Sequence, residues 1–380
     1  WNNSGNSGVH NYTNYTDVSK QVRRNDVSYL GTVSFVDYVE GIYMGYKFYE
    51  TAADEGFINY DEYVQFPFGY GLSYTSFKEE ITGFEQSDDA VTVEVTVTNE
   101  GSVAGKDAVE LYFTPPYTNG GIEKASVNLV DFAKTQLLEP GESETVTFTV
   151  KLEDLASYDS AGIKIPGGGY ILEAGEYVMS VRADSHTVID SKSFNVSSDV
   201  KYTEGRGSDK KAPVNLFDYA ESKGEVLSRK DKFANYAAAT AVPDESRFEL
   251  SKDETKTIQK TTMAKYKASD HDVDGDTMPT TGASNGLKLA DMTGKGYDDA
   301  DWDKLLDQLS VEDMVTLVNN GGWTTAEITS VGKVMTSDCD GPSGLSNYLT
   351  GAMGTQFPTE VLMAQTGSKE RAYKIGVAMA

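Results

Sequence analysis

The sequence predicts a multidomain α+β protein with a β-sandwich at its centre, and two patterns support this prediction. Between Ala90 and Val196, short runs alternate apolar and polar side chains, a period of two that buries one face of a strand and wets the other. On both sides of this region, apolar residues recur at helical spacing instead. With 380 residues, the chain has room for two or three domains.

The predicted sandwich rests on four alternating runs and on the turns between them. In the clearest run, Val91, Val93, Val95 and Val97 alternate with polar residues, and the same period returns in 109–113, 146–150 and 177–181. Turn signals at 99–101, 139–142 and 174–176 separate the runs. Short strands over about a hundred residues indicate a sandwich of immunoglobulin or fibronectin type III shape. Because the segment contains neither Cys nor Trp, the fibronectin type III-like form is favoured.

Composition excludes several classes of partner. The chain holds 33 Lys and Arg against 59 Asp and Glu, for a net charge of −26, which repels phosphate backbones and anionic lipid. We therefore expect neither nucleic-acid nor membrane binding, and no apolar stretch is long enough to span a bilayer. A single cysteine, Cys339, rules out an internal disulfide. Without a signal-peptide pattern at Trp1, the compartment stays unknown, with the bacterial cytoplasm slightly favoured.

The N-terminal flank combines a predicted loop, a helix and an aromatic connector. Residues 1–30 are polar and predict a loop or a peripheral strand, whereas apolar residues from Val36 to Ala53 recur at helical spacing, with Gly56 as the stop. The aromatic and glycine-rich stretch 66–74 then leads into the sandwich. It could form a sugar-stacking surface, but a packed joint between domains is the favoured interpretation.

The segment 199–290 is polar and heterogeneous, which predicts an extended connection with a short helix at Tyr236–Ala241. Residues 270–276 begin like a calcium loop. In an EF-hand the closing glutamate would fall at Thr281, so a solvated acidic turn is favoured. We therefore expect no calcium ion at this turn.

From Asp301 the helical period returns, and Ser310 with Asp313 forms a capping box. We expect a short buried strand at 334–336, then an acidic and glycine-rich turn, and then a helix from about Thr359 to Ala380. A helix, a strand ending in acid and glycine, and another helix are typical of the opening of an α/β barrel, in which ligands lie at the carboxyl ends of the strands.

Three motifs resemble glycoside hydrolase family 3. The sequence 340–345 (DGPSGL) followed by 354–358 (GTQFP) resembles the first barrel strands, and 66–75 (FPFGYGLSYT) resembles the signature before the fibronectin-like domain. The turns at 138–143 and 175–177 are similar to that domain's strand turns. The barrel start comes last here, which resembles the subgroup with inverted domain order, as in some bacterial β-glucosidases.

The resemblance implies four regions. Residues 1–77 would be the C-terminal part of an α/β sandwich domain, 78–198 the fibronectin type III-like domain, 199–290 an extended linker, and 291–380 the N-terminal part of a TIM-like barrel. A whole barrel needs about 250 residues, so this one is incomplete and the chain is expected to be a fragment.

The resemblance also implies a retaining β-glycosidase that hydrolyses β-glucosides or related oligosaccharides without metal or organic cofactor. Such chemistry needs two carboxyl groups ~5 Å apart. Neither the nucleophile nor the acid/base has a matching position in this chain, so no catalytic residue is assigned and the chain alone is expected to be inactive. A second chain that completes the barrel is a further expected partner.

One functional residue carries over from the family. Asp340 occupies the position of the aspartate that holds sugar hydroxyls, and Gly341 and Gly344 would let the backbone approach the ligand. Apart from the resemblance, Asp340 could equally cap the turn after a strand. Ser346 and Thr366-Gly367-Ser368 depart from the family pattern. The rival function is a non-catalytic accessory, carbohydrate-binding or adhesion module built on the fibronectin-like sandwich.

Overall fold

The computed structural model describes residues 39–214, 225–241, 252–253, 256, 267–320, 323–341, 343–347 and 351–379. These residues divide into two compact units, here called unit 1 (1–263 and 367–369) and unit 2 (264–366 and 370–380). The predicted loop or peripheral strand at 1–30 lies outside the described residues. None of the described helices is both long and apolar enough to cross a membrane.

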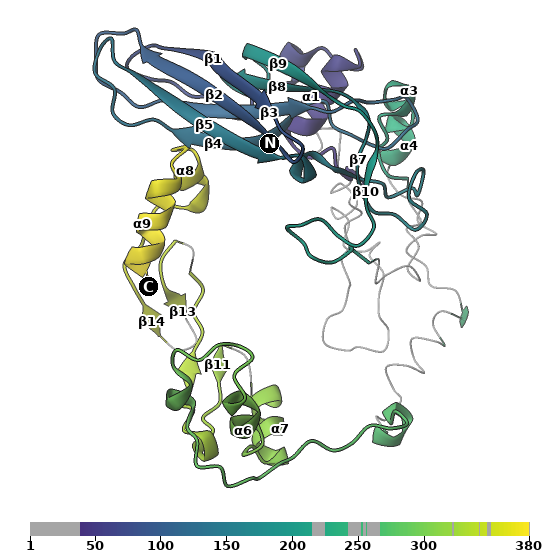
Figure 1. Cartoon of the computed structure of the whole chain (residues 1–380), viewed down its shortest axis with the longest axis vertical. Coiled ribbons are helices and arrows are strands. Elements are labelled where there is room, and N and C mark those ends of the chain that lie inside the picture. The colour runs from purple at the N-terminus through teal and green to yellow at the C-terminus, as the bar shows by residue number, and fades with distance from the viewer. Residues whose placement is uncertain are drawn as a thin grey trace. The chain divides into compact units, whose positions relative to one another are not determined.

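Unit 1 contains the predicted sandwich, with one sheet of three strands and one of four (Figure 1). The first sheet has the order β1-β2-β5 and the second β4-β3-β8-β9, and all neighbouring strands are antiparallel. The strand bounds are β1 Phe77–Gln86, β2 Ala90–Asn99, β3 Ala108–Thr114, β4 Asn128–Lys134, β5 Ser143–Lys151, β8 Gly175–Arg182 and β9 Val188–Val196. A smaller sheet, in the order β10-β7-β6, joins β6 Ser157–Tyr158, β7 Tyr170–Leu172 and β10 Val200–Tyr202.

The alternating runs form the sandwich core, as the sequence predicts. The four valines of β2 are completely buried, and Leu111 of β3 and Met179 of β8 pack with them in one apolar cluster. Because successive side chains of a strand point to opposite faces, the polar residues between the valines lie on the outer face. Gly141 has φ +82° in the predicted turn after β4, a conformation that favours glycine.

Sequence periodicity did not identify β1, β4, β7 and β9. Their apolar positions are fewer, and the burial of β4 is intermediate along its whole length. Edge strands such as β9 expose most of their side chains, so they carry little alternation. The predicted connection at 199–290 also begins inside the fold, since β10 pairs with β7.

The helix predicted from Val36 to Ala53 is shorter than its pattern. The described helix, α1, spans Tyr46–Asp54 and follows Gly45 with φ +58°, a conformation outside the helical region. Gly56 follows the helix with φ +67°, as expected of a residue that stops one. Val36 lies outside the described residues, and Val39 and Ile42 lie in turns before the helix, so their spacing does not extend it.

The prediction that 66–74 forms a packed joint is wrong for most of this segment, because most of its large side chains are exposed. Leu72 is 89% exposed and Tyr74 is 100% exposed, and Phe66 is 61% exposed. Phe68 stacks on Tyr46 of α1 with ring centroids 4.7 Å apart, and the Phe66 and Tyr70 rings contact each other with centroids 5.1 Å apart. Apart from Phe68, the apolar residues of this stretch are thus largely exposed in unit 1.

Part of the predicted linker folds against α1. The helices α3 Lys230–Phe233 and α4 Tyr236–Ala239 contribute Phe233 and Ala239 to a second core, which also contains Tyr43 and Phe48. The short helix expected at 236–241 is therefore present, but this stretch is a packed part of unit 1 rather than an extended connection. The segment packs because it contains aromatic side chains, and burying these against α1 stabilises the folded conformation.

Unit 2 is mainly helical around a small core. Its elements are η5 Ala268–His271, η6 Leu289–Met292, α6 Asp301–Leu306, α7 Val311–Asn319, β11 Thr324–Thr325, η7 Thr329–Val331, β12 Thr336–Ser337, β13 Ser346–Asn347, β14 Ala352–Met353 and α8 Glu360–Ala364. The helix α9 Lys369–Met379 follows. The predicted capping box is present, because the Ser310 side chain accepts from the Asp313 N–H and the Asp313 carboxylate accepts from the Ser310 N–H.

Two predictions for unit 2 need correction. In place of the expected buried strand at 334–336, the structure has the two-residue strand β12. Val334 and Met335 precede β12 and are exposed, because β12 pairs only with β11 among the described residues. The expected continuous helix after Thr359 is divided into α8 and α9, since Gly367 adopts φ +59° between them. Thr359 itself caps α8 by accepting from the Leu362 N–H.

Glu79 of β1 should make the stability of unit 1 depend on pH. Burial raises the pKa of Glu79 to about 9, and the neighbouring Asp107 and Glu110 carboxyls add to this effect. Burial also raises the pKa of Asp107, although the nearby Lys134 opposes the shift. Since the folded-state pKa of Glu79 lies above its usual 4.5, the stabilisation is complete below pH 4.5 and is lost as pH rises through about 9.

Urea unfolding at pH values from 5 to 9 tests this expectation. The wild-type free energy of unfolding should fall by up to ~1.4 kcal/mol per pH unit for this proton. Glu79→Gln should flatten the profile, whereas the exposed neighbour Glu80→Gln should leave it unchanged. Equal slopes for the wild type and Glu79→Gln would contradict the assignment.

Candidate functional site

The predicted sugar-binding turn lies in unit 2 between β12 and β13. Asp340 forms an isolated bridge with Ser346, whose N–H donates to the Asp340 carbonyl at 2.9 Å. Gly344 closes the turn by donating its N–H to the Gly341 carbonyl at 3.1 Å. The Asp340 side chain is exposed, and its carboxylate has no hydrogen-bond partner among the described residues. It is therefore free to accept hydrogen bonds from a hydroxylated ligand.

Gly344 brings the two sequence motifs together. Its φ is +124°, and a Cβ there would lie 2.4 Å from the carbonyl oxygen of Thr355. The Phe357 N–H donates to the Ser343 carbonyl at 2.8 Å, which fixes the second motif beside the first. Gly341 is different, because a Cβ there would meet only ordinary contacts, the nearest at 3.6 Å. Close backbone approach thus requires glycine at 344 but not at 341.

Unit 1 contains a cavity that is formed by residues that the sequence analysis did not identify. Its volume is about 750 Å³. The lining residues come from the end of α1, the end of β3, the loop after β3 and the segment around α3: Glu55, Thr114, Pro115, Tyr117, Asn119, Arg229, Asp231 and Lys232. No periodicity or motif links these residues, and three of them, Arg229, Asp231 and Lys232, belong to the segment that the sequence predicts as a connection.

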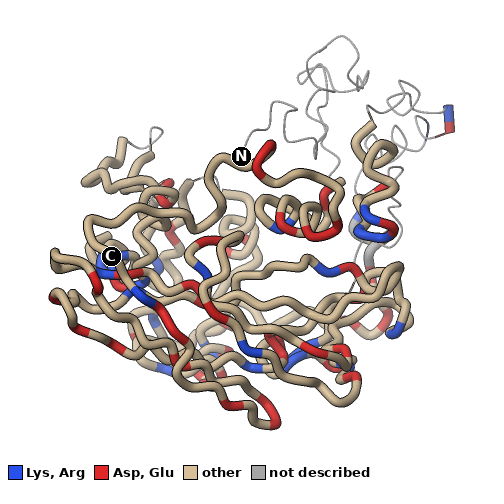
Figure 2. The backbone as a smooth tube through the Cα atoms, turned by 90° about the horizontal axis from the view of Figure 1, so that it is seen from above, with Lys and Arg blue, Asp and Glu red and all other residues tan. Residues whose placement is uncertain are grey.

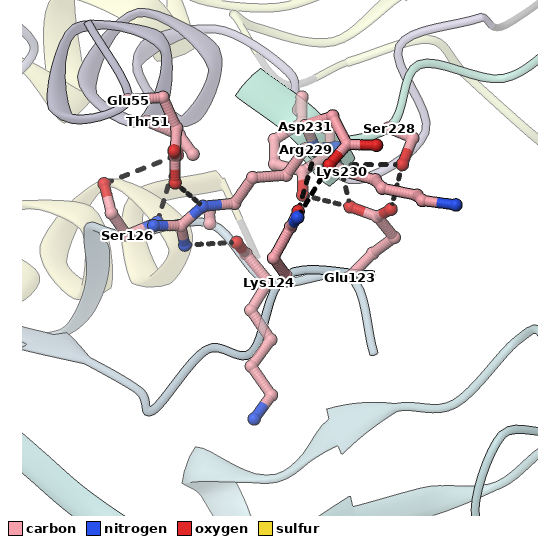
Figure 3. Close-up of polar contacts among 12 residues, drawn as sticks. Thr51, Glu55, Glu123, Lys124, Ser126, Ser228, Arg229, Lys230 and Asp231 are labelled. Atoms are coloured by element: carbon pink, nitrogen blue, oxygen red, sulfur yellow. Dashed lines mark hydrogen bonds and ion pairs between the residues drawn. The ribbon is translucent and has the colours of Figure 1, made fainter. Parts of the chain in front are cut away.

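Arg229 is the central charged group of this cavity wall. Its Nε donates to a Glu55 carboxylate oxygen at 2.7 Å, and its Nη1 donates to the Lys124 carbonyl at 3.0 Å (Figure 3). The guanidinium also lies 4.0 Å from the centroid of the Tyr117 ring, within the range of a cation–π contact. Both side chains of the ion pair are mostly buried, at 11% and 19% exposed. This geometry holds Arg229 in one orientation.

Glu123 ties the same segment to the second core. It accepts from the Tyr43 hydroxyl. It also accepts from the Ser228 hydroxyl and, at 3.0 Å, from the Arg229 N–H (Figure 3). Burial and the bond to Glu123 raise the pKa of Tyr43, so this tyrosine stays a hydrogen-bond donor. The carboxylate therefore anchors the start of α3 through both side-chain and backbone donors.

A buried carboxylate in unit 1, Glu50 of α1, gathers three donors. It accepts from the Tyr60 hydroxyl at 2.6 Å and the Ser185 hydroxyl at 2.7 Å, and the His186 Nδ1 lies 2.9 Å from its other oxygen. The Tyr60 and His186 rings stack with centroids 3.7 Å apart. A Ser, His and acid cluster is reminiscent of a hydrolase triad, but here Ser185 and His186 both bond to Glu50 rather than to each other. The geometry joins α1 to the β8–β9 turn and activates no nucleophile.

The acidic segment 270–276 carries exposed carboxylates at Asp270, Asp272, Asp274 and Asp276. Over the part of the chain that the structure describes, no group of three or more His, Cys, Asp and Glu side chains is placed to hold a metal ion. Acidic residues are spread along strands and loops rather than gathered at one place (Figure 2).

Comparisons with known proteins and with domain models agree on the class of protein that this chain resembles. A model of the fibronectin type III-like domain matches residues 107–185, inside the sandwich. The chain is 30% identical over 370 residues to "Beta-glucosidase A" of Butyrivibrio fibrisolvens, which covers 90% of this chain and 42% of that protein. It is also 38% identical over 161 residues to a β-glucosidase of Ruminococcus albus, covering 42% of this chain and 16% of the relative.

A solved structure agrees with these matches. The β-glucosidase from Paenibacillus barengoltzii aligns with a TM-score of 0.59 and 25% identity, over 89% of this chain and 35% of that one. The chain is thus a homologue of β-glucosidases that carries a fibronectin type III-like domain. These homologues are of glycoside hydrolase family 3, the family that the sequence motifs resemble. The chain spans less than half the length of each of these relatives.

Proposed function

We propose that this chain is part of a retaining β-glycosidase that hydrolyses β-glucosides or related oligosaccharides. The observation that carries the proposal is the 30% identity over 370 residues to a protein named as a β-glucosidase, because that match extends through both units. A match confined to the sandwich would be equally compatible with an accessory module. Similarity across both units favours the enzyme instead.

We further propose the domain assignment that the sequence motifs predict. Residues 1–77 would end an α/β sandwich domain, 78–198 would be the fibronectin-like domain, and 291–380 would begin a barrel. Residues 199–290 would connect the last two, with 225–241 packed as part of unit 1. The exposure of apolar side chains in unit 2 supports this proposal, since further barrel strands and helices would bury them. These side chains include Val315, Val318, Val334, Met335 and Val361. More polypeptide, in the same chain or in a partner chain, would complete the barrel.

In this proposal the Asp340 turn binds sugar. The Asp340 carboxylate would accept hydrogen bonds from two neighbouring hydroxyls, and charge-assisted bonds of this kind are stronger than those between neutral groups. The tight packing at Gly344 would hold the two motifs in a fixed arrangement around the carboxylate. Gly341 would contribute only by leaving space for the ligand.

The catalytic carboxylates are not assigned to this chain. Retaining glycosidases separate their two carboxyl groups by ~5 Å so that the glycosidic bond fits between them. Burial raises the pKa of two neighbouring acids of unit 1, Glu79 and Asp107, but neither lies in a motif that matches a catalytic position of the family. We therefore expect the 380-residue chain to bind sugar at the Asp340 turn but not to hydrolyse it.

The test is release of p-nitrophenol from p-nitrophenyl β-D-glucopyranoside by the purified chain of verified mass. We expect no turnover above a heat-inactivated control. Turnover that Asp340→Ala abolishes would contradict the assignment of the missing carboxylates and would place the reaction in unit 2. Turnover that persists in Asp340→Ala would contradict the role of Asp340, and acids elsewhere in the chain would then be responsible.

A further inference from the structure

The cavity of unit 1 has the size of a small-molecule site. Its volume of about 750 Å³ falls within the ~300–1,000 Å³ typical of ligand pockets. It is bounded by side chains from three separate parts of the chain, which the fold brings together. A second, smaller cavity of about 160 Å³ lies along the same loop and includes Gly120 and Lys230.

The charges of the cavity wall are balanced. Two acids, Glu55 and Asp231, face two cations, Arg229 and Lys232. Glu55 is paired with Arg229, and Asp231 exchanges two hydrogen bonds with Asn119, at 2.7 and 2.8 Å. A strongly charged ligand would meet a like charge on one side of the cavity. A neutral ligand with many hydroxyls can instead donate to the carboxylates and accept from the cations.

Several polar groups of the wall have unused hydrogen-bonding capacity. Neither the Lys232 ammonium nor the Thr114 hydroxyl has a partner among the described residues. The Tyr117 hydroxyl is buried beside them and makes no side-chain hydrogen bond among the described residues, and the Gly120 backbone is its polar neighbour. The Lys232 ammonium and the Thr114 hydroxyl can therefore both bond to a ligand in the cavity.

The backbone that presents these groups is strained and firmly held. Asp231, Lys232 and Phe233 all have positive φ, at 50°, 60° and 59°, a conformation that residues other than glycine rarely adopt. The buried Phe233 ring holds the turn in place by packing edge-on against Tyr43, with centroids 5.1 Å apart. Strained turns that the surrounding structure maintains are concentrated at ligand-binding sites.

We propose that this cavity binds a neutral sugar, of the size of a mono- or disaccharide. The ligand's hydroxyls bond to the Lys232 ammonium, the Thr114 hydroxyl and the outward carboxylate oxygens, while the Arg229–Glu55 pair keeps the wall rigid. The proposal does not depend on the glycosidase assignment, because it uses residues of unit 1 alone.

The experiment is a titration of the full chain with methyl β-D-glucopyranoside and with cellobiose. Calorimetry and ligand-observed NMR measure the binding. We expect Thr114→Val to weaken binding about fivefold, which corresponds to one neutral hydrogen bond. We expect Lys232→Ala to weaken it about tenfold, because a bond to a charged donor is stronger. Lys192→Ala, at an exposed position of β9, is the matched control and should bind like the wild type.

Asp340→Ala separates this site from the turn in unit 2. Binding that survives Asp340→Ala but falls in Thr114→Val and Lys232→Ala supports the proposal. Three results would overturn it. They are no binding by the wild type, loss of all binding in Asp340→Ala with the two cavity variants unchanged, and tighter binding of sodium glucuronate or glucosamine than of the neutral sugars. Circular dichroism of each variant confirms that the fold is intact.

Discussion

Replacing Glu50 by alanine should lower the free energy of unfolding of unit 1 by about 3–5 kcal/mol. The side chain is only 4% exposed, and it accepts from the hydroxyls of Tyr60 and Ser185 and contacts His186. Removing it leaves buried donors without an acceptor and opens a cavity between α1 and the β8–β9 turn. Each of these changes is destabilising by itself.

Urea unfolding followed by tyrosine fluorescence measures this effect, with Asp54→Ala as the control. Asp54 lies on the same helix but is exposed, so its loss should change the stability by less than about 0.5 kcal/mol. Glu50→Gln, which keeps an acceptor oxygen for the hydroxyls, should fall between the two. If Glu50→Ala were as stable as Asp54→Ala, the carboxylate would not be holding α1 against the sandwich.

Replacing Asn99 by alanine should cost about 2–4 kcal/mol, the second largest effect that we expect. Asn99 is completely buried at the end of β2. Its Nδ2 donates to the carbonyls of Val103 and Leu138, both at 2.9 Å, and its Oδ1 accepts from the Thr75 hydroxyl at 2.7 Å. The alanine variant would leave these groups buried without partners.

Asn99→Asp is the sharper variant, because it keeps the shape but turns the donor into an acceptor that faces two carbonyl oxygens. It should be at least as destabilising as alanine, and acid should restore part of the loss by protonating the carboxyl. Asn195→Ala, at an exposed position of β9, is the control and should have little effect. Wild-type stability in Asn99→Asp at neutral pH would show that the side-chain amide is not needed as a donor.

Much of the sandwich could be predicted because burial on one face of a strand requires a period of two. The valines of β2 and the apolar positions of β3 and β8 are buried as their alternation predicts. The same reasoning failed for β4 and β9, whose half-buried or edge positions do not require alternation. The motif of the Asp340 turn could also be recognised, since Gly344 is needed where two backbone segments touch.

The candidate site of unit 1 could not be predicted in this way. Arg229 and Glu55 are 174 positions apart, and their ion pair depends on how the segment 225–241 folds against α1. The length of the N-terminal helix was equally out of reach, because apolar residues in turns can imitate helical spacing when they pack on the same core.

The sequence by itself determined the β-sandwich, its turns and the family whose motifs the chain shares, because these depend on local patterns of burial and on short motifs. Only the tertiary structure decided that the aromatic stretch 66–74 is largely uncovered in unit 1 and that 225–241 packs as part of it. It also decided which charged groups surround the cavity. The physical reason is that ion pairs, aromatic packing and cavities form between residues far apart in the chain. Local periodicity does not predict such contacts.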